Sequence, residues 1–126
     1  MDRGRAVSQT ISVDFDGVLH SYTSKWVSAS VIPDPPVPGA IEWLNSMAEK
    51  FEIVVHTTRA RSADGREAVA LYLIQHGLSD RAKRRIVVSY EKLPAIIYID
   101  DRAWRFQGTF PTVTEIQEAR PWNKPA

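Results

Sequence analysis

The sequence predicts an α/β protein: a three-layer, Rossmann-like sandwich around a mainly parallel central sheet. Three observations support this prediction. Apolar, strand-like runs alternate with amphipathic helical stretches. The later strands are almost continuously apolar, which is typical of strands covered on both faces. Polar residues gather where the strands end, which is where such sheets bind ligands. We expect one domain over residues 1–126, with an N-terminal arm over 1–9 and a tail over 120–126.

The first half of the chain alternates strand, loop and helix. A β-branched run over 10–15 predicts the first strand, which stops at the Asp16-Gly17 turn. The stretch 20–38 contains four prolines, so it cannot be helical, and we expect a Pro-rich flap shaped as a small hairpin. Apolar residues then recur at spacings of three and four over 39–51, which predicts an amphipathic helix.

The second half continues the alternation and ends with smaller elements. We predict a strand over 52–57, a helix over 65–76, strands over 86–89 and 95–99, an edge element over 103–110 and a short helix over 112–119. Right-handed crossovers between these strands would place them in one parallel sheet.

Composition excludes several classes of site. The chain has 126 residues, no Cys and a formal net charge of +1. Without Cys there is no disulfide framework, thiolate zinc site, iron–sulfur cluster or cysteine nucleophile. The balanced charge gives no overall field toward nucleic acid or membranes. No apolar run is long enough for a membrane span and no secretion signal is visible, so we expect a cytoplasmic protein.

The residues at the ends of the predicted strands are polar and would share one edge of the sheet. They are Asp14, Asp16, Thr57, Lys92, Asp100 and Asp101. Carboxylates without Cys or clustered His form an all-oxygen site, which suits Mg²⁺ better than zinc or copper. A lysine and a hydroxyl add the positive charge and the donor that a phosphate group needs.

Four motifs, each at a strand end and in the same order, resemble the haloacid dehalogenase-like superfamily of phosphotransferases. The first is VDFDGVL over 13–19, and the second is IVVHT, which ends at Thr57 and is followed by Arg59. The third is Lys92 and the fourth is the IYIDD run over 97–101. The resemblance covers most of the chain and implies phosphate chemistry at an Mg²⁺ site.

The resemblance implies a role for each acidic residue. Asp14 would be the nucleophile that forms an aspartyl-phosphate. Asp16 would protonate the leaving oxygen and then activate water, while its backbone carbonyl helps to hold Mg²⁺. Asp100 would bind the metal, and Asp101 would act either through water or as a supporting partner. The second carboxylate, Asp16, argues for phosphate esters rather than carbon–halogen bonds.

The remaining site residues would bind the phosphoryl group or the substrate. Thr57 and Lys92 would hold the transferring phosphoryl group, and Gly17 and Arg59 would contribute to substrate binding. The structural alternatives are a Thr57 hydroxyl that caps the next turn and a solvated surface Lys92. Strand alternation directs His56 away from Thr57, so we leave His56 out of the site.

Members of this superfamily usually have a cap domain over the site, and only 40 residues separate Asp16 from Thr57, too few for one. The resemblance therefore implies a single domain with no cap domain, a capless Mg²⁺-dependent phosphatase of a phosphate monoester. A nucleotide or polynucleotide-end phosphatase is an alternative, and Trp104 or Phe106 would then stack on a base, although core packing also explains these aromatic residues. A third possibility is a non-catalytic regulatory domain that binds Mg²⁺ and phosphate. The expected partner is a phosphorylated small molecule or nucleotide, with nucleic acid possible, and the oligomeric state stays open.

Overall fold

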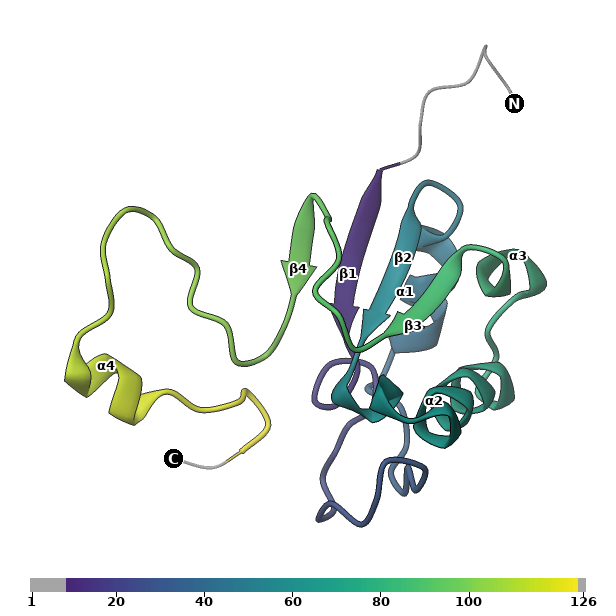
Figure 1. The fold of residues 1–126 in the computed structure, drawn as a ribbon, viewed down its shortest axis with the longest axis horizontal. Helices are drawn as coiled ribbons and strands as arrows, with labels where there is room; N and C mark the ends of the chain where they lie inside the picture. The colour runs from purple at the N-terminus through teal and green to yellow at the C-terminus, as the bar shows by residue number, and fades with distance from the viewer. Residues whose placement is uncertain (1–8, 125–126) are drawn as a thin grey trace.

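The computed structural model describes residues 9–124, which contain a four-stranded sheet with all strands parallel (Figure 1). The strand order is β3-β2-β1-β4. The strands are β1 (Thr10–Asp14), β2 (Glu52–His56), β3 (Ile86–Ser89) and β4 (Ile97–Ile99). This arrangement confirms the predicted α/β class and the parallel sheet.

One face of the sheet carries the apolar core. Val13 and Val55 are register partners in β1 and β2, and both are fully buried against Leu44 and Leu73. Every second strand residue points to this face, so a single set of β-branched side chains meets the helices. The helices that contribute to this core are α1 (Ala40–Met47), α2 (Ala63–Gln75) and α3 (Asp80–Lys83).

Two helix boundaries differ from the sequence prediction for local reasons. Helix α1 ends at Met47, and turns rather than helix continue to residue 50, so the predicted helix over 39–51 is too long. Helix α2 begins at Ala63, two residues earlier than predicted, because the Ser62 hydroxyl accepts a hydrogen bond from the Gly65 amide. Such a side-chain cap provides an acceptor for a first-turn amide, which has no carbonyl partner within the helix.

Among residues 9–124, no helix covers the opposite face of the sheet. Residues 90–96 link β3 to β4, at opposite edges of the sheet, without a helix. Val87 and Tyr98 are 57% and 40% exposed, so the prediction that these strands are covered on both faces is wrong. Helix α4 (Val113–Glu118) lies beside the sheet rather than on it (Figure 1). A third layer is therefore not confirmed.

The predicted loop regions are irregular, as expected, but one predicted element does not form. Over 20–38 the backbone makes only isolated bridges, including Ser28 with Val31, and it contains no helix. Over 103–110 there is neither strand nor helix, which corrects the predicted edge element. The predicted arm over 1–9 lies almost wholly outside the described residues. No helix in the described part of the chain is long and apolar enough to cross a bilayer.

Candidate metal and phosphate site

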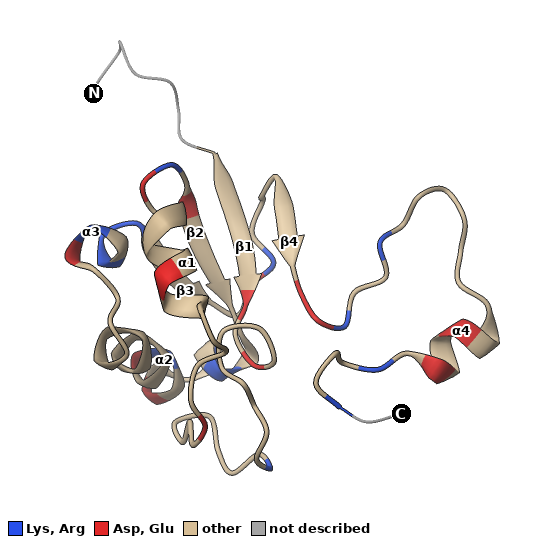
Figure 2. Cartoon of the chain, turned by 180° about the vertical axis from the view of Figure 1, so that it is seen from behind, with Lys and Arg blue, Asp and Glu red and all other residues tan. Residues whose placement is uncertain are grey.

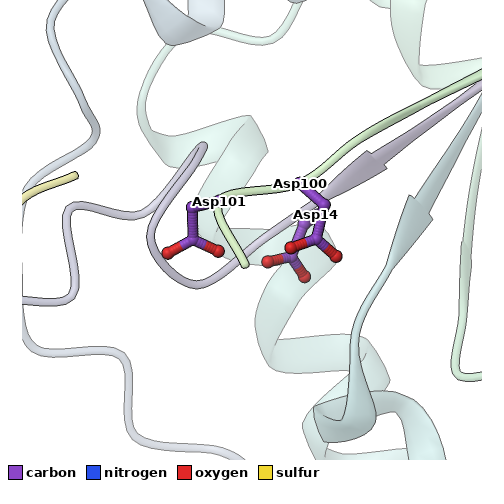
Figure 3. Close-up of side chains that lie close together, drawn as sticks. All are labelled: Asp14, Asp100 and Asp101. Atoms are coloured by element: carbon purple, nitrogen blue, oxygen red, sulfur yellow. The ribbon is translucent and has the colours of Figure 1, made fainter. Parts of the chain in front are cut away.

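Three carboxylates meet at the carboxyl ends of the two adjacent strands β1 and β4. Asp14 is the last residue of β1, and Asp100 and Asp101 directly follow β4. One oxygen from each carboxylate lies within 4.8 Å of the others. Figure 3 shows Asp14 and Asp100 next to each other, with Asp101 approaching from the adjoining loop. The structure therefore brings together three of the four predicted metal ligands.

Asp101 reaches this cluster because Gly17 has no side chain. Gly17 has φ +88°, and a Cβ atom there would collide with the Asp101 carboxylate. One oxygen of Asp101, Oδ1, is buried and has no hydrogen-bond partner within the described residues. A buried carboxylate oxygen without a partner is costly unless a cation or water satisfies it. This oxygen, and the all-oxygen donor set, fit a hard divalent cation such as Mg²⁺.

The surroundings of Asp14 disfavour the ionised form of its carboxyl group. Burial, together with the nearby charges of Asp100 and Asp101, raises the pKa of Asp14 from 3.8 to about 8. Like charges this close disfavour a second ionised carboxylate. A bound cation would remove the repulsion and restore the ionised Asp14 that a nucleophile requires.

Asp16 belongs to a separate hydrogen-bonded cluster next to the triad. Its carboxylate accepts hydrogen bonds from His20 Nδ1 at 2.8 Å and from Arg59 Nε at 2.9 Å. The Asp34 amide donates to His20 Nε2 at 3.1 Å, which leaves the Nδ1 proton for Asp16. Burial alone would raise the pKa of Asp16, but the bonds from His20 and Arg59 outweigh it and lower that pKa.

Arg59 links the Asp16 cluster to the flap. Its side chain is 1% exposed, and Nη1 donates to the backbone carbonyls of Ser28, Ala29 and Val31 at 2.9 to 3.0 Å. The guanidinium also lies over the Trp26 ring, 4.4 Å from its centroid. The structure therefore places Arg59 inside the protein, where it orders both the flap and Asp16.

The two predicted phosphoryl-binding residues have different surroundings. Thr57 is buried, and its Oγ1 accepts a hydrogen bond from the Arg59 amide at 3.2 Å, capping the short helix η1 (Thr58–Arg61). Lys92 lies on the link between β3 and β4, with its ammonium 4.8 Å from the centroid of the Tyr98 ring. Lys92 also lines the cavity that contains Asp14 and Asp100, whereas Thr57 does not.

This cavity, of about 570 Å³, lies over the sheet face that has no helical layer. Its lining combines carboxylates, cations and aromatic or aliphatic side chains. The lining residues are Ser12, Asp14, His56, Lys92, Ile96, Ile97, Tyr98, Ile99, Asp100, Ala103, Trp104 and Arg105. Figure 2 shows acidic positions at the adjoining ends of β1 and β4, with basic positions on the segment that follows β4.

Sequence reasoning missed His56 as a neighbour of the nucleophile candidate. Alternation within β2 separates it from Thr57, as expected, but the strand register pairs His56 with Asp14. Register partners in a parallel sheet share a face, so His56 lines the cavity, and its Nε2 lies 3.2 Å from the Tyr90 carbonyl oxygen. No signal in the sequence predicts this pairing, because the register between the two strands is not specified locally.

The C-terminal tail contacts the loop that follows Asp16. Trp122 Nε1 donates to the Gly17 carbonyl at 2.6 Å, and Asn123 Nδ2 donates to the Ser21 carbonyl at 2.7 Å. Lys124 Nζ donates to the Tyr22 carbonyl at 3.2 Å. The tail therefore supports the loop on which Gly17 makes room for Asp101.

Comparisons with protein-family models, curated proteins and solved structures found no match to this chain. The resemblance to a phosphotransferase superfamily therefore rests on the order of the four motifs in the sequence alone.

Proposed function

We propose that this protein is an Mg²⁺-dependent phosphatase that hydrolyses a phosphate monoester through an aspartyl-phosphate on Asp14. The observation that carries the proposal is the meeting of Asp14, Asp100 and Asp101 at one edge of a parallel sheet, with a partnerless buried oxygen on Asp101. Asp16 lies two residues after Asp14, and its carboxylate would serve for proton transfer.

Three carboxylates, and the Asp16 backbone carbonyl by analogy with the superfamily, would hold the Mg²⁺ ion. When bound, the ion supplies positive charge that offsets the carboxylates and attracts the phosphate oxygens. Lys92 lines the same cavity and would bind a phosphate oxygen by charge and hydrogen bonding. Thr57, the other residue predicted to hold the phosphoryl group, is buried at the start of η1 and does not line this cavity, so the proposal gives it no contact with the phosphate.

The reaction would proceed in two displacements at phosphorus. In the first, an ionised Asp14 oxygen attacks phosphorus, the bond to the leaving oxygen breaks, and Asp16 gives that oxygen a proton. In the second, Asp16 takes a proton from water as the water oxygen attacks phosphorus, and the bond to Asp14 breaks. Phosphate leaves, and Asp14 returns to its carboxylate form.

The electrostatics of Asp16 suit the second displacement. Hydrogen bonds from His20 and Arg59 favour its ionised form and lower its pKa, and the ionised form is the one that accepts a proton from water. In the first displacement Asp16 acts as an acid, so it must still carry the proton that it took from water in the preceding cycle. Substrates with a poor leaving group should depend on this proton more strongly than those with a good one.

The test is phosphate release from a panel of monoesters, with Mg²⁺ and with chelator, for the wild type, Asp14→Asn and the matched control Glu67→Gln. Glu67 is an exposed carboxylate on α2. We expect Mg²⁺-dependent release by the wild type and Glu67→Gln, and none above background by Asp14→Asn. Equal release by Asp14→Asn would refute the proposal. Mg²⁺ binding by the wild type without any release would favour the non-catalytic binding domain.

A further inference from the structure

The cavity beside the carboxylates has two chemically different parts. Asp14, Asp100 and Lys92 supply charged groups, whereas Tyr98 and Trp104 supply aromatic surface. Tyr98 lies in β4 and Asp100 directly follows this strand, two residues further along the chain. Their side chains therefore point to the same face of the sheet. An extended chain rises about 3.3 Å per residue, which separates the two positions by roughly 6 to 7 Å.

Both aromatic side chains offer surface to a ligand. The Tyr98 hydroxyl donates to the Leu93 carbonyl at 2.8 Å, which fixes its ring, and the side chain is 40% exposed. Trp104 is 50% exposed and makes no hydrogen bond, ring stack or cation–π contact with any residue between 9 and 124. Arg105, which also lines the cavity, forms no ion pair within the same described range.

From this arrangement we infer that the cavity binds a nucleoside monophosphate, with the base stacked on Trp104 and the phosphate near Asp14. This inference rests on the proposed function for the position of the phosphate. A base carries a flat apolar surface that matches an indole ring, and its carbonyl groups or ring nitrogens can accept hydrogen bonds from Arg105. The sugar would span the interval between Asp100 and Tyr98.

Cavity size suits a nucleotide, in which a sugar separates the base from the phosphate. In an aryl phosphate the ring is bonded directly to the phosphate oxygen and fills less of the cavity. The volume of about 570 Å³ lies within the usual range for small-molecule sites and leaves space for a sugar and a base. Lys92 and Arg105 balance the charges of Asp14 and Asp100 in the lining, so binding of a dianionic phosphate also depends on the Mg²⁺ of the proposed function.

The first test compares kcat/KM for the four common nucleoside 5′-monophosphates with that for ribose 5-phosphate, which lacks only the base. Stacking of a base on an aromatic side chain predicts a preference of about tenfold or more for at least one nucleotide. Trp104→Ala should lose this preference mainly through KM, whereas Trp104→Phe should keep most of it. Phe110→Ala is the control, since Phe110 is 79% exposed and does not line the cavity.

The second test measures binding of the same nucleosides without phosphate, by calorimetry in the presence of chelator, so that it does not depend on turnover. Binding that weakens about tenfold in Trp104→Ala, but not in Phe110→Ala, would support the base site even if no ester were hydrolysed. Hydrolysis with no preference over ribose 5-phosphate, together with no nucleoside binding, would overturn the inference and leave the phosphatase proposal standing.

Two further outcomes would overturn the base site. A preference for phenyl phosphate over every nucleotide would assign the aromatic wall to an aryl group attached directly to the phosphate. A dimer by light scattering that dissociates in Trp104→Ala, without nucleoside binding, would show that a second copy of the chain covers this face instead.

Discussion

Replacing Asp14 by asparagine should stabilise the protein when no divalent cation is present. Burial and the charges of Asp100 and Asp101 raise the pKa of Asp14 from 3.8 to about 8. In the unfolded chain the carboxyl ionises freely, so the folded state holds an extra proton between these two values. The favourable contribution of the protonated carboxyl is complete below pH 4 and is lost as the pH rises through 8.

The size of the effect follows from the shift in pKa. One pKa unit corresponds to about 1.4 kcal/mol, so the roughly three units between the unfolded pKa of 3.8 and pH 7 set an upper limit of about 4 kcal/mol at pH 7. Partial exposure to water reduces this penalty, and we expect a net gain of about 2 kcal/mol for Asp14→Asn. The asparagine keeps the shape of the protonated acid but has no proton to lose.

Urea unfolding with chelator, followed from pH 4 to pH 8, measures this gain as a difference in unfolding free energy. The wild type should lose stability across this range relative to Asp14→Asn, and the control Glu67→Gln should follow the wild type. Added Mg²⁺ should stabilise the wild type by mass action and leave Asp14→Asn nearly unchanged. Parallel pH curves for the wild type and Asp14→Asn would refute the argument that burial and the neighbouring carboxylates raise the pKa of Asp14.

Three other predictions test the residues around the triad. Gly17→Ala should weaken Mg²⁺ binding about tenfold or more, because its Cβ would displace Asp101. Gly39→Ala is the matched control, since Gly39 has a similar φ of +83° with nothing within 4 Å of an added Cβ. Calorimetric titration with Mg²⁺ should show weaker binding by Gly17→Ala but not by Gly39→Ala. Arg59→Ala should destabilise the fold by about 3 kcal/mol in urea, with partial recovery in Arg59→Lys, because it leaves the partly buried Asp16 charge and three flap carbonyls without the buried guanidinium. Asp16→Asn should reduce hydrolysis of alkyl phosphates about a hundredfold more than hydrolysis of p-nitrophenyl phosphate, whose leaving group needs no proton, and equal losses would argue against its role as an acid.

Much of the fold could be predicted from hydrophobic periodicity. The β-branched runs that became β1, β2 and β3 were placed within one residue, because each must bury alternate side chains such as Val13 and Val55. The missing layer could not be predicted in the same way. An apolar run such as 95–99 has the same composition in a covered strand and in an exposed edge strand, and what differs is the short link over 90–96.

The candidate site was predictable where it depends on strand ends and unpredictable where it depends on side-chain partners. Asp14 ends β1, and Asp100 and Asp101 follow β4, so their placement at one edge of a parallel sheet could be predicted, whereas the adjacency of β1 and β4 could not. The burial of Arg59 could not, because its three carbonyl partners belong to an irregular loop without periodicity. The position of His56 in the cavity depends on the register between β1 and β2, which the local sequence does not specify.

The most direct test of the central claim is to quench wild-type turnover of a phosphate monoester with acid and to locate any phosphoryl group by mass spectrometry of the digested protein. The account predicts one added phosphoryl group on the peptide that contains Asp14, seen only with Mg²⁺ and absent from Asp14→Asn. An acid-stable phosphoryl group on another residue, or Mg²⁺-dependent phosphate release by Asp14→Asn, would contradict it.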